Sequence, residues 1–434
     1  MAKALYQSLV LAVLAAFLFI TIPQSYATNA LERYVQQPDQ TFAWEIETQT
    51  TINDFTVTHV KMTSQTWRDH VWTHHLKIIR PQTLRHPEMA LLFITGDHSG
   101  TRINETLQSW ADRAGAIVAE VTRVPNQPLY DGRKEDALIA YTLDQYLRTG
   151  DETWPALFPM TKSAVRAMDT VQAWAHEKHL QKIEKFVVAG ASKRGWTTWL
   201  TGAIDARVTA IAPIVIDVLN MKAQTEWAQK VYGRQSQHIS DYTDLNLVQQ
   251  MDSPPMQKLR SWVDPYSYRA RYTMPKLLLL GTNDPYWTVD ALRHYWDDLP
   301  EPKLVFQTPN GGHALGKNAS ETLAAFFQMI ADQEELPKME WQLAHDDQGF
   351  LRVKVDRPAK AIHVWTAESA TRDFRKAEWS YRTLETRPGS SQGSVEVDKP
   401  ASGYRAFMGE VVLTSSTGHE YKLSRPRSRF CRIS

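Results

Sequence analysis

The chain has 434 residues, a formal net charge of +1 and 43% hydrophobic residues. This length allows more than one hydrophobic core, and the near-neutral charge gives no reason to expect a nucleic acid partner. The single cysteine, Cys431, excludes an intramolecular disulfide.

The first 27 residues are typical of a secretion signal. Lys3 precedes an apolar run from Leu9 to Ile22, and Ser25 and Ala27 are the small residues expected before a cleavage point. A membrane anchor is the alternative, but the run is short for a span, and no later segment of the sequence is long and apolar enough. We therefore expect a secreted or periplasmic protein with no stable membrane span after signal removal. The sequence does not indicate its oligomeric state.

Residues 28–335 have the pattern of an α/β domain. Alternating β-branched and polar residues over about 41–80 predict an antiparallel meander that opens a sheet. From Met89 onward, short apolar runs alternate with helix-like segments, which predicts a mixed, mostly parallel sheet flanked by helices. The expected strands are 91–95, 117–121, 186–189, 208–216, 277–280 and 304–308, and the expected helices are 103–114, 134–147, 161–179, 194–204, 289–299 and 319–330.

Two further parts of the chain depart from this alternation. The polar and aromatic segment 221–272 lies between two expected strands, where a lid over a site is usual. Residues 336–434 contain short alternating runs separated by turn residues, which predicts a β-sandwich of the immunoglobulin or fibronectin type. Its expected strands include 405–408 and 410–413 as separate runs.

The segment from Lys185 to Leu200 has the pattern of a nucleophile elbow, the strained turn that exposes a serine between a strand and a helix. The apolar run ends at Gly190, and Ser192 follows. The usual pattern has glycine two residues after the serine, but here Arg194 stands there and Gly195 comes one residue later. By itself this pattern also fits an ordinary turn serine that caps the next helix.

Two later loops favour the elbow. Asp284 follows the expected strand 277–280, and His313 follows the strand 304–308 in a glycine-rich loop. Serine, aspartate and histidine in this order, each after a strand, predict a hydrolase triad of Ser192, Asp284 and His313. Asp217, at the end of 208–216, is the rival acid, and His98 is a further candidate to line the site.

The oxyanion donors are expected to be the backbone N–H of Lys193 and an N–H of the Gly96–Asp97 loop. The side chains of Lys193 and Arg194 place positive charge beside the nucleophile. Two interpretations are open. The side chains contact an anionic substrate or the oxyanion, or they pair with nearby acids or point to solvent. No metal or organic cofactor is expected for this chemistry.

Several segments together resemble the family of PhoPQ-activated pathogenicity-related proteins. The segments are 133–142, 158–169, 190–197, 214–220, 281–284, 311–313 and 372–375, and the Lys-Arg pair after the serine fits this family. The resemblance implies an α/β-hydrolase fold with a C-terminal β-domain, export, and a tie to PhoPQ-controlled responses, but no substrate. The elbow is also similar, locally and more weakly, to that of glucuronoyl esterases.

The sequence therefore predicts an exported serine hydrolase whose partner is a small-molecule or polymeric ester, with an amide as the less favoured substrate. The alternative is a non-catalytic binding or signalling protein that keeps a hydrolase scaffold, since a fold by itself does not establish activity.

Overall fold

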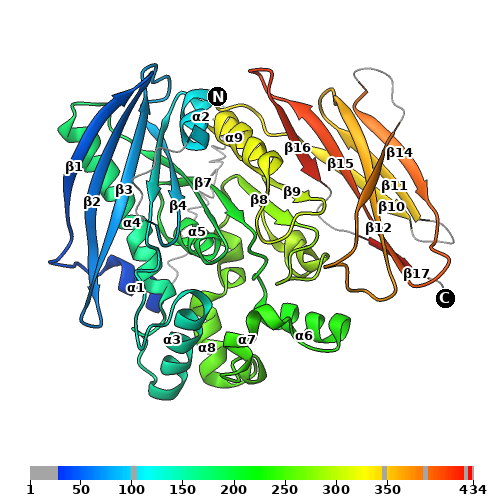
Figure 1. The fold of residues 1–434 in the computed structure, drawn as a ribbon, viewed down its shortest axis with the longest axis horizontal. Helices are drawn as coiled ribbons and strands as arrows, with labels where there is room; N and C mark the ends of the chain where they lie inside the picture. Colours follow the sequence, from blue (N-terminus) through cyan, green and yellow to red (C-terminus); the bar gives the residue numbers. More distant parts are fainter. Residues whose placement is uncertain (1–27, 99–104, 345–348, 385–389, 425–428, 433–434) are drawn as a thin grey trace, which may run out of the picture.

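The structure is a computed structural model that describes residues 28–98, 105–344, 349–384, 390–424 and 429–432 (Figure 1). The predicted secretion signal, residues 1–27, lies outside the described residues.

A nine-stranded sheet of described residues forms the centre of the molecule, in the order β1-β2-β3-β5-β4-β6-β7-β8-β9. The first three strands and the β3–β5 pair are antiparallel, and the pairs from β5 through β9 are parallel. This confirms the predicted mixed, mostly parallel sheet. The strands are β1 (Ala43–Ile52), β2 (Phe55–Trp67), β3 (His70–Pro81), β4 (Met89–Ile94), β5 (Ile117–Val121), β6 (Lys185–Ala191), β7 (Val208–Ile214), β8 (Lys276–Gly281) and β9 (Lys303–Thr308).

Helices cover both faces of this sheet, because its central strands are apolar on both sides. Every residue of β5 and β8 is buried. Helices α4 and α5 share a core with one face, and α2 and α9 share a second core with the other. The helices around the sheet are α1 (Ala30–Gln36), α2 (Glu105–Ala114), α3 (Glu135–Thr149), α4 (Leu157–Glu177), α5 (Lys193–Ile204) and α9 (Lys317–Ala331).

The helix predicted over 289–299 is wrong. The structure has two short 3₁₀ turns there, η4 (Ala291–His294) and η5 (Trp296–Asp298). Side chains at the start of the inserted segment and just before it take the carbonyls that a continuous helix would use. Asn220 Nδ2 donates to the His294 carbonyl at 2.9 Å, and Gln224 Nε2 donates to the Ala291 carbonyl at 3.1 Å.

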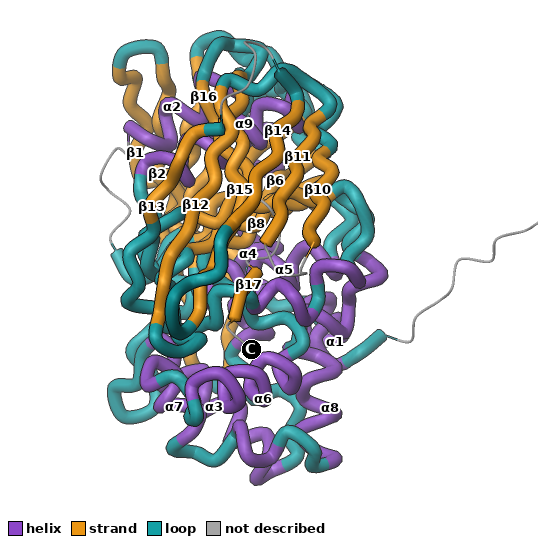
Figure 2. Tube along the Cα trace, turned by 90° about the vertical axis from the view of Figure 1, so that its right-hand side faces the viewer, coloured by secondary structure: helices purple, strands orange, loops and turns teal. Residues whose placement is uncertain are grey.

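The inserted segment 221–272 is helical and lies beside α3, at the lower end of the molecule in Figures 1 and 2. It contains α6 (Met221–Tyr232), η1 (Gln237–Ile239), α7 (Ser240–Thr243), η2 (Val248–Gln250), α8 (Pro254–Val263) and η3 (Pro265–Arg271). None of the helices in the described ranges is long and apolar enough to cross a membrane.

The C-terminal residues form two antiparallel sheets, which agrees with the predicted sandwich (Figure 2). Leu351, Val364, Val397 and Phe407 join the two sheets in one buried cluster. The strands are β10 (Met339–Ala344), β11 (Gly349–Val355), β12 (Ala361–Ser369), β13 (Ser380–Thr383), β14 (Gln392–Val397), β15 (Tyr404–Thr414), β16 (Glu420–Ser424) and β17 (Arg429–Arg432).

The two runs expected at 405–408 and 410–413 are one continuous strand, β15. Gly409 between them is no turn. A Cβ at Gly409 would collide with the ring of Trp341, so glycine here makes room for an aromatic side chain of β10.

The C-terminal sheets share the α2–α9 core with the α/β part. That core includes Val353, Ile362 and Leu423 of the sheets together with Phe326 and Phe327 of α9. The hydrolase-like sheet and the sandwich are therefore packed through one continuous apolar interior.

Candidate active site

Ser192 occupies the turn between β6 and α5 in a strained conformation, with φ 58° and ψ −124°. The Ser192 N–H donates to the Ile214 carbonyl at 2.8 Å, which ties the turn to β7. A non-glycine residue with positive φ is uncommon and persists where the surroundings enforce it. The strand, turn and helix have the geometry of a nucleophile elbow.

Two glycines allow this turn to close. A Cβ at Gly190 would lie 2.7 Å from the Arg194 carbonyl oxygen, and a Cβ at Gly195 would lie 2.6 Å from Ile216 Cγ2. Both contacts are too short for a side chain. Gly195 therefore provides the close helix-to-strand approach, one residue later than the common hydrolase pattern places its glycine.

The structure brings Ser192, His313 and Asp284 together in a linear arrangement. Ser192 Oγ lies 2.8 Å from His313 Nε2, and Asp284 Oδ2 lies 2.9 Å from His313 Nδ1. Asp284 is buried, whereas the His313 side chain is 28% exposed. With the proton on Nδ1, the imidazole donates to the carboxylate and accepts from the serine hydroxyl, as nucleophile activation requires.

The loop after β8, which carries Asp284, and the loop after β9, which carries His313, are joined by backbone hydrogen bonds; they are called the acid loop and the histidine loop. The Asn283 N–H donates to the Gly311 carbonyl at 2.9 Å, and the Thr282 N–H donates to the Thr308 carbonyl at 3.0 Å. A Cβ at Gly281 would collide with the carbonyls of Gly311 and Gly312. The position of Asp284 is thus coupled through the backbone to that of His313.

The C-terminal part also contacts these loops. Asn283 Nδ2 donates to the Ala377 carbonyl at 2.7 Å, with the Arg375 and Phe374 carbonyls at 3.3 and 3.4 Å. In the histidine loop, Asn310 exchanges two hydrogen bonds with the backbone of Trp379, both 2.8 Å long. Residues 374–379 therefore support both loops from outside the α/β part.

Asp217, the rival acid, is buried but is not the partner of His313 in this structure. Burial raises the pKa of Asp217 to about 7, an effect that the Tyr295 hydroxyl opposes and that the charges of Asp284 and Asp290 increase. Its carboxyl group is consequently part neutral at pH 7, unlike an acid that stabilises an imidazolium.

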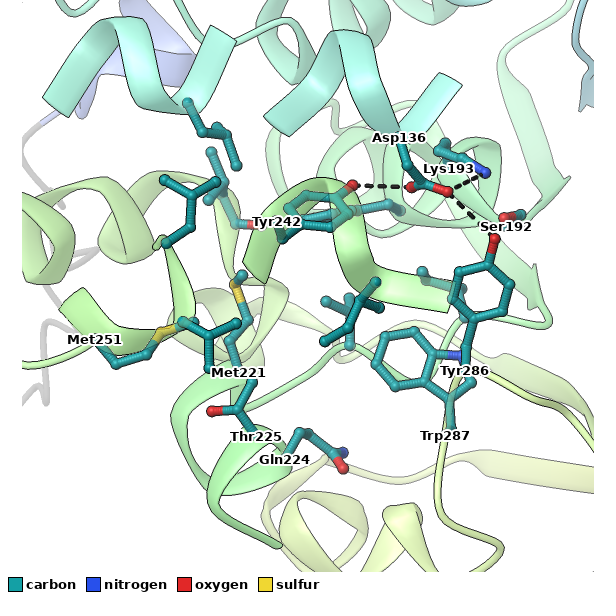
Figure 3. A pocket seen from close by; sticks show the side chains of 18 of the residues that line it. Asp136, Ser192, Lys193, Met221, Gln224, Thr225, Tyr242, Met251, Tyr286 and Trp287 are labelled. Carbon is teal, nitrogen blue, oxygen red and sulfur yellow. Dashed lines mark hydrogen bonds and ion pairs between the residues drawn. The ribbon is translucent and has the colours of Figure 1, made fainter. Parts of the chain in front are cut away.

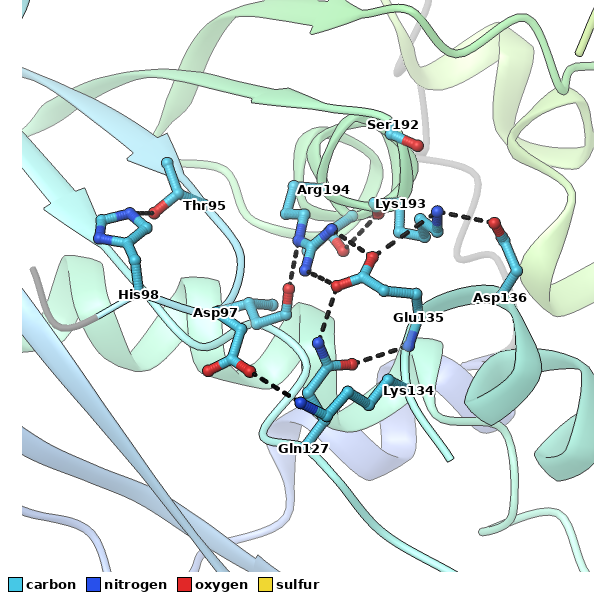
Figure 4. Close-up of polar contacts among 12 residues, drawn as sticks. Thr95, Asp97, His98, Gln127, Lys134, Glu135, Asp136, Ser192, Lys193 and Arg194 are labelled. Carbon is cyan, nitrogen blue, oxygen red and sulfur yellow. Dashed lines mark hydrogen bonds and ion pairs between the residues drawn. The ribbon is translucent and has the colours of Figure 1, made fainter. Parts of the chain in front are cut away.

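The Arg194 side chain does not reach the serine side of the elbow (Figure 4). Its Nη1 and Nη2 donate to the two carboxylate oxygens of Glu135 at 2.7 and 2.6 Å, and its Nε donates to the Val124 carbonyl at 2.5 Å. Burial alone would raise the pKa of Glu135, but the hydrogen bonds and charge of Arg194 outweigh this and lower it to about 2. Of the two readings of Arg194, the structure favours pairing with an acid.

Lys193 lies on the serine side of the elbow. Its Nζ contacts Asp136 at 2.7 Å and Glu135 at 3.6 Å. The hydroxyls of Tyr242 and Tyr286 also donate to Asp136, at 2.9 and 3.3 Å. This cluster joins α3, α5, the lid and the acid loop beside Ser192 (Figure 3).

Tyr286 had no place in the sequence-based site. Its ring stacks on His313 with centroids 4.4 Å apart. The available signal was its position two residues after Asp284, in the same loop.

The Gly96–Asp97 loop lies on the Arg194 side of the elbow. A Cβ at Gly96 would lie 2.5 Å from Arg194 Nη2, so a side chain there would displace the guanidinium. Asp97 pairs with Lys134 at 3.7 Å on the surface, and His98 Nε2 lies 3.1 Å from the Thr95 hydroxyl and 3.4 Å from Glu120. Asp97 and His98 are not among the residues that line the pocket at Ser192.

A pocket opens beside Ser192 and His313 and continues along the inserted segment 221–272, the predicted lid (Figure 3). Lys193 and Asp136 line it together with many apolar side chains of the lid. Within the described ranges, no group of three or more His, Cys, Asp or Glu side chains is arranged to hold a metal ion.

Two solved structures are similar to this fold. The acetyl xylan esterase 1 of Thermoanaerobacterium sp. aligns with a TM-score of 0.51 at 14% identity, over 70% of this chain and 92% of that chain. An acetyl xylan esterase from Paenibacillus sp. R4 aligns with a TM-score of 0.50 at 14% identity, over 69% and 90%. At this identity the likeness establishes the α/β-hydrolase fold alone.

The sequence comparisons reach further along the chain. Autocrine proliferation repressor protein A of Dictyostelium discoideum is 31% identical over 94% of this chain and 92% of its own length. Residues 31–375 match the family described as PhoPQ-activated pathogenicity-related protein. The chain therefore belongs to the PhoPQ-activated pathogenicity-related protein family.

Proposed function

We propose that this protein is a serine hydrolase that cleaves a carboxylic ester, with an amide as the less favoured substrate. The observation that carries the proposal is the continuous Ser192–His313–Asp284 hydrogen-bond arrangement on a strained elbow. The α/β-hydrolase fold, which it shares with esterases of known structure, is compatible with this chemistry.

In the proposed reaction, Ser192 Oγ attacks the carbonyl carbon while His313 Nε2 accepts the hydroxyl proton. Asp284 orients His313 and stabilises its charged form. His313 then protonates the departing alcohol, and a covalent acyl-enzyme remains on Ser192. Water, deprotonated by His313, releases the acid and restores the serine.

The negative oxygen of the tetrahedral intermediate needs backbone donors. The Lys193 N–H is in the first turn of α5, where helix N–H groups have no intrahelical acceptor. We propose it as one donor and keep the Gly96 loop as the source of the other. Arg194 has a supporting part in this proposal, because its guanidinium lies against Gly96 and donates to the Val124 carbonyl.

Labelling with a fluorophosphonate tests the proposal. The probe should react covalently with the wild type and fail to react with Ser192→Ala, because it requires an activated serine. Circular dichroism of both proteins checks that each is folded. A folded wild type that resists the probe would refute the proposal.

A binding or signalling function is the second candidate, and the name of the Dictyostelium relative, a proliferation repressor, is the observation that favours it. In that case the Ser192→Ala protein should bind or signal as the wild type does.

We also propose that the protein is exported after removal of residues 1–27. An intact Met1 in protein recovered from the cell envelope or medium would contradict this.

Asn283 offers a test of how the acid loop is held. Asn283→Ala is expected to lower kcat for a p-nitrophenyl ester roughly tenfold with little change in KM, because Asp284 loses its support while the pocket is intact. Asn318→Ala, an exposed change on α9, is the matched control and should leave both constants at wild-type values. A rise in KM with unchanged kcat would show that Asn283 does not position the acid.

A further inference from the structure

The pocket at Ser192 differs in polarity between its two ends. Ser192, His313, Lys193 and Asp136 lie at the end where the reaction is proposed to occur. The rest of the lining is mostly apolar and includes Val218, Met221, Leu247, Met251, Met256 and Leu259, with Gln224 and Thr225 as polar exceptions. In Figure 3, Met251 lies far across the pocket from Ser192.

The charges at the reactive end are already balanced. Lys193 and Asp136 pair with each other at 2.7 Å, and the Tyr242 hydroxyl completes the contact with Asp136. In the rest of the pocket, Gln224 and Thr225 already donate to backbone carbonyls. This part of the lining therefore offers little compensation for a polar group taken out of water, which makes burial of such a group there costly. An apolar group gains free energy by the same transfer.

The shape of the pocket restricts which apolar group fits. Its cavity volume is only about 90 Å³, yet the lining extends from Ser192 to Met251, which lie far apart in Figure 3, so the space is narrow for its length. A slender chain therefore fits better than a ring or a branched group. The three methionines in the lining are flexible enough to follow a chain along its length.

We propose that this pocket binds the unbranched aliphatic acyl arm of the substrate, an assignment that rests on the proposed ester hydrolysis at Ser192. The acyl arm stays attached to Ser192 Oγ through both halves of the reaction, so it can remain deep beneath the lid. The alcohol must leave between the two steps, which a deep narrow pocket would hinder. The substrates are thus esters of straight-chain fatty acids.

Initial rates on p-nitrophenyl acetate, butanoate, hexanoate and octanoate test the assignment. Each methylene that enters the pocket is expected to raise kcat/KM roughly fourfold until the pocket is filled. The cyclohexanecarboxylate ester should be at least about tenfold poorer than the hexanoate. A series of acetate esters with lengthening alcohols should show no comparable rise.

Two variants, one inside the segment 221–272 and one outside it, sharpen the test. Met251→Trp fills the far end and should move the best chain to a shorter length, lowering the octanoate-to-butanoate ratio by about tenfold or more. Met274→Trp is the matched control, because Met274 is half-buried and outside the pocket lining. Its ratio should equal that of the wild type.

The outcomes separate the two proposals. Ser192-dependent hydrolysis with no chain-length rise, with a rise on the alcohol side, or with equal ratios in the two variants would overturn the acyl-arm assignment alone. Absence of both hydrolysis and fluorophosphonate labelling would overturn the proposed function, and the assignment with it.

Discussion

Asp284→Asn is expected to lower kcat by roughly a thousandfold or more. The amide can donate its N–H to His313 Nδ1, which then carries no proton. The ring proton lies on Nε2 instead, and this tautomer cannot accept the Ser192 proton. The present 2.9 Å contact makes Asp284 the acid that fixes this tautomer. Steady-state kinetics on a p-nitrophenyl ester, with Tm as a check on folding, measure the effect.

Asp217→Asn is the matched control, because both acids are buried at neighbouring strand ends. Burial raises the pKa of Asp217 to about 7, so an uncharged amide resembles the group it replaces. Its kcat should fall by less than about tenfold, in keeping with the absence of a direct role in tautomer control. If Asp217→Asn were the more damaging change, Asp217 would take the role assigned to Asp284.

Glu135→Gln is expected to destabilise the fold by about 2–3 kcal/mol at neutral pH, because the buried Arg194 guanidinium loses its charged partner. The estimate is below that for a fully enclosed pair, since the Glu135 side chain is 36% exposed. Thermal unfolding should show a Tm lowered by several degrees. Glu226→Ala, at a largely exposed lid acid, is the control and should leave Tm unchanged.

The destabilisation caused by Glu135→Gln should also depend on pH. The folded-state pKa of Glu135 is about 2, below its ordinary value of about 4.5. The carboxylate therefore contributes its full stability above about pH 4.5, and this contribution is lost as the pH falls toward 2. The difference in Tm between the wild type and Glu135→Gln should be constant between pH 7 and 5 and become smaller in more acidic buffers. A difference that widened on acidification would contradict the Arg194 pairing.

The arrangement of the triad was accessible from the sequence because each of its residues lies within five residues of the end of a parallel strand. Strand ends at one edge of a sheet meet, so local patterns around Ser192, Asp284 and His313 carried three-dimensional information. The parallel strands themselves were recognisable because burial on both faces leaves nearly continuous apolar runs.

Partners that depend on distant loops were not accessible. The local pattern does not predict that Arg194 binds Glu135, 59 residues earlier. Successive side chains of one helical turn point in different directions, so their partners cannot be assigned from spacing. The spacing over 289–299 suggested a helix, yet Asn220 and Gln224 take its carbonyls. In both cases tertiary contacts override a local preference.

The contacts of residues 374–379 with the acid and histidine loops bear on the time at which the proposed triad becomes fully supported. The serine elbow is complete when the first half of the chain has been made, but the backbone carbonyls that hold Asn283 belong to residues about 160 positions later. Translation proceeds from the N-terminus, and the early part of the chain can fold first. We therefore expect Ser192 of a nascent chain to be unreactive, and the proposed hydrolysis to begin only when synthesis is nearly finished.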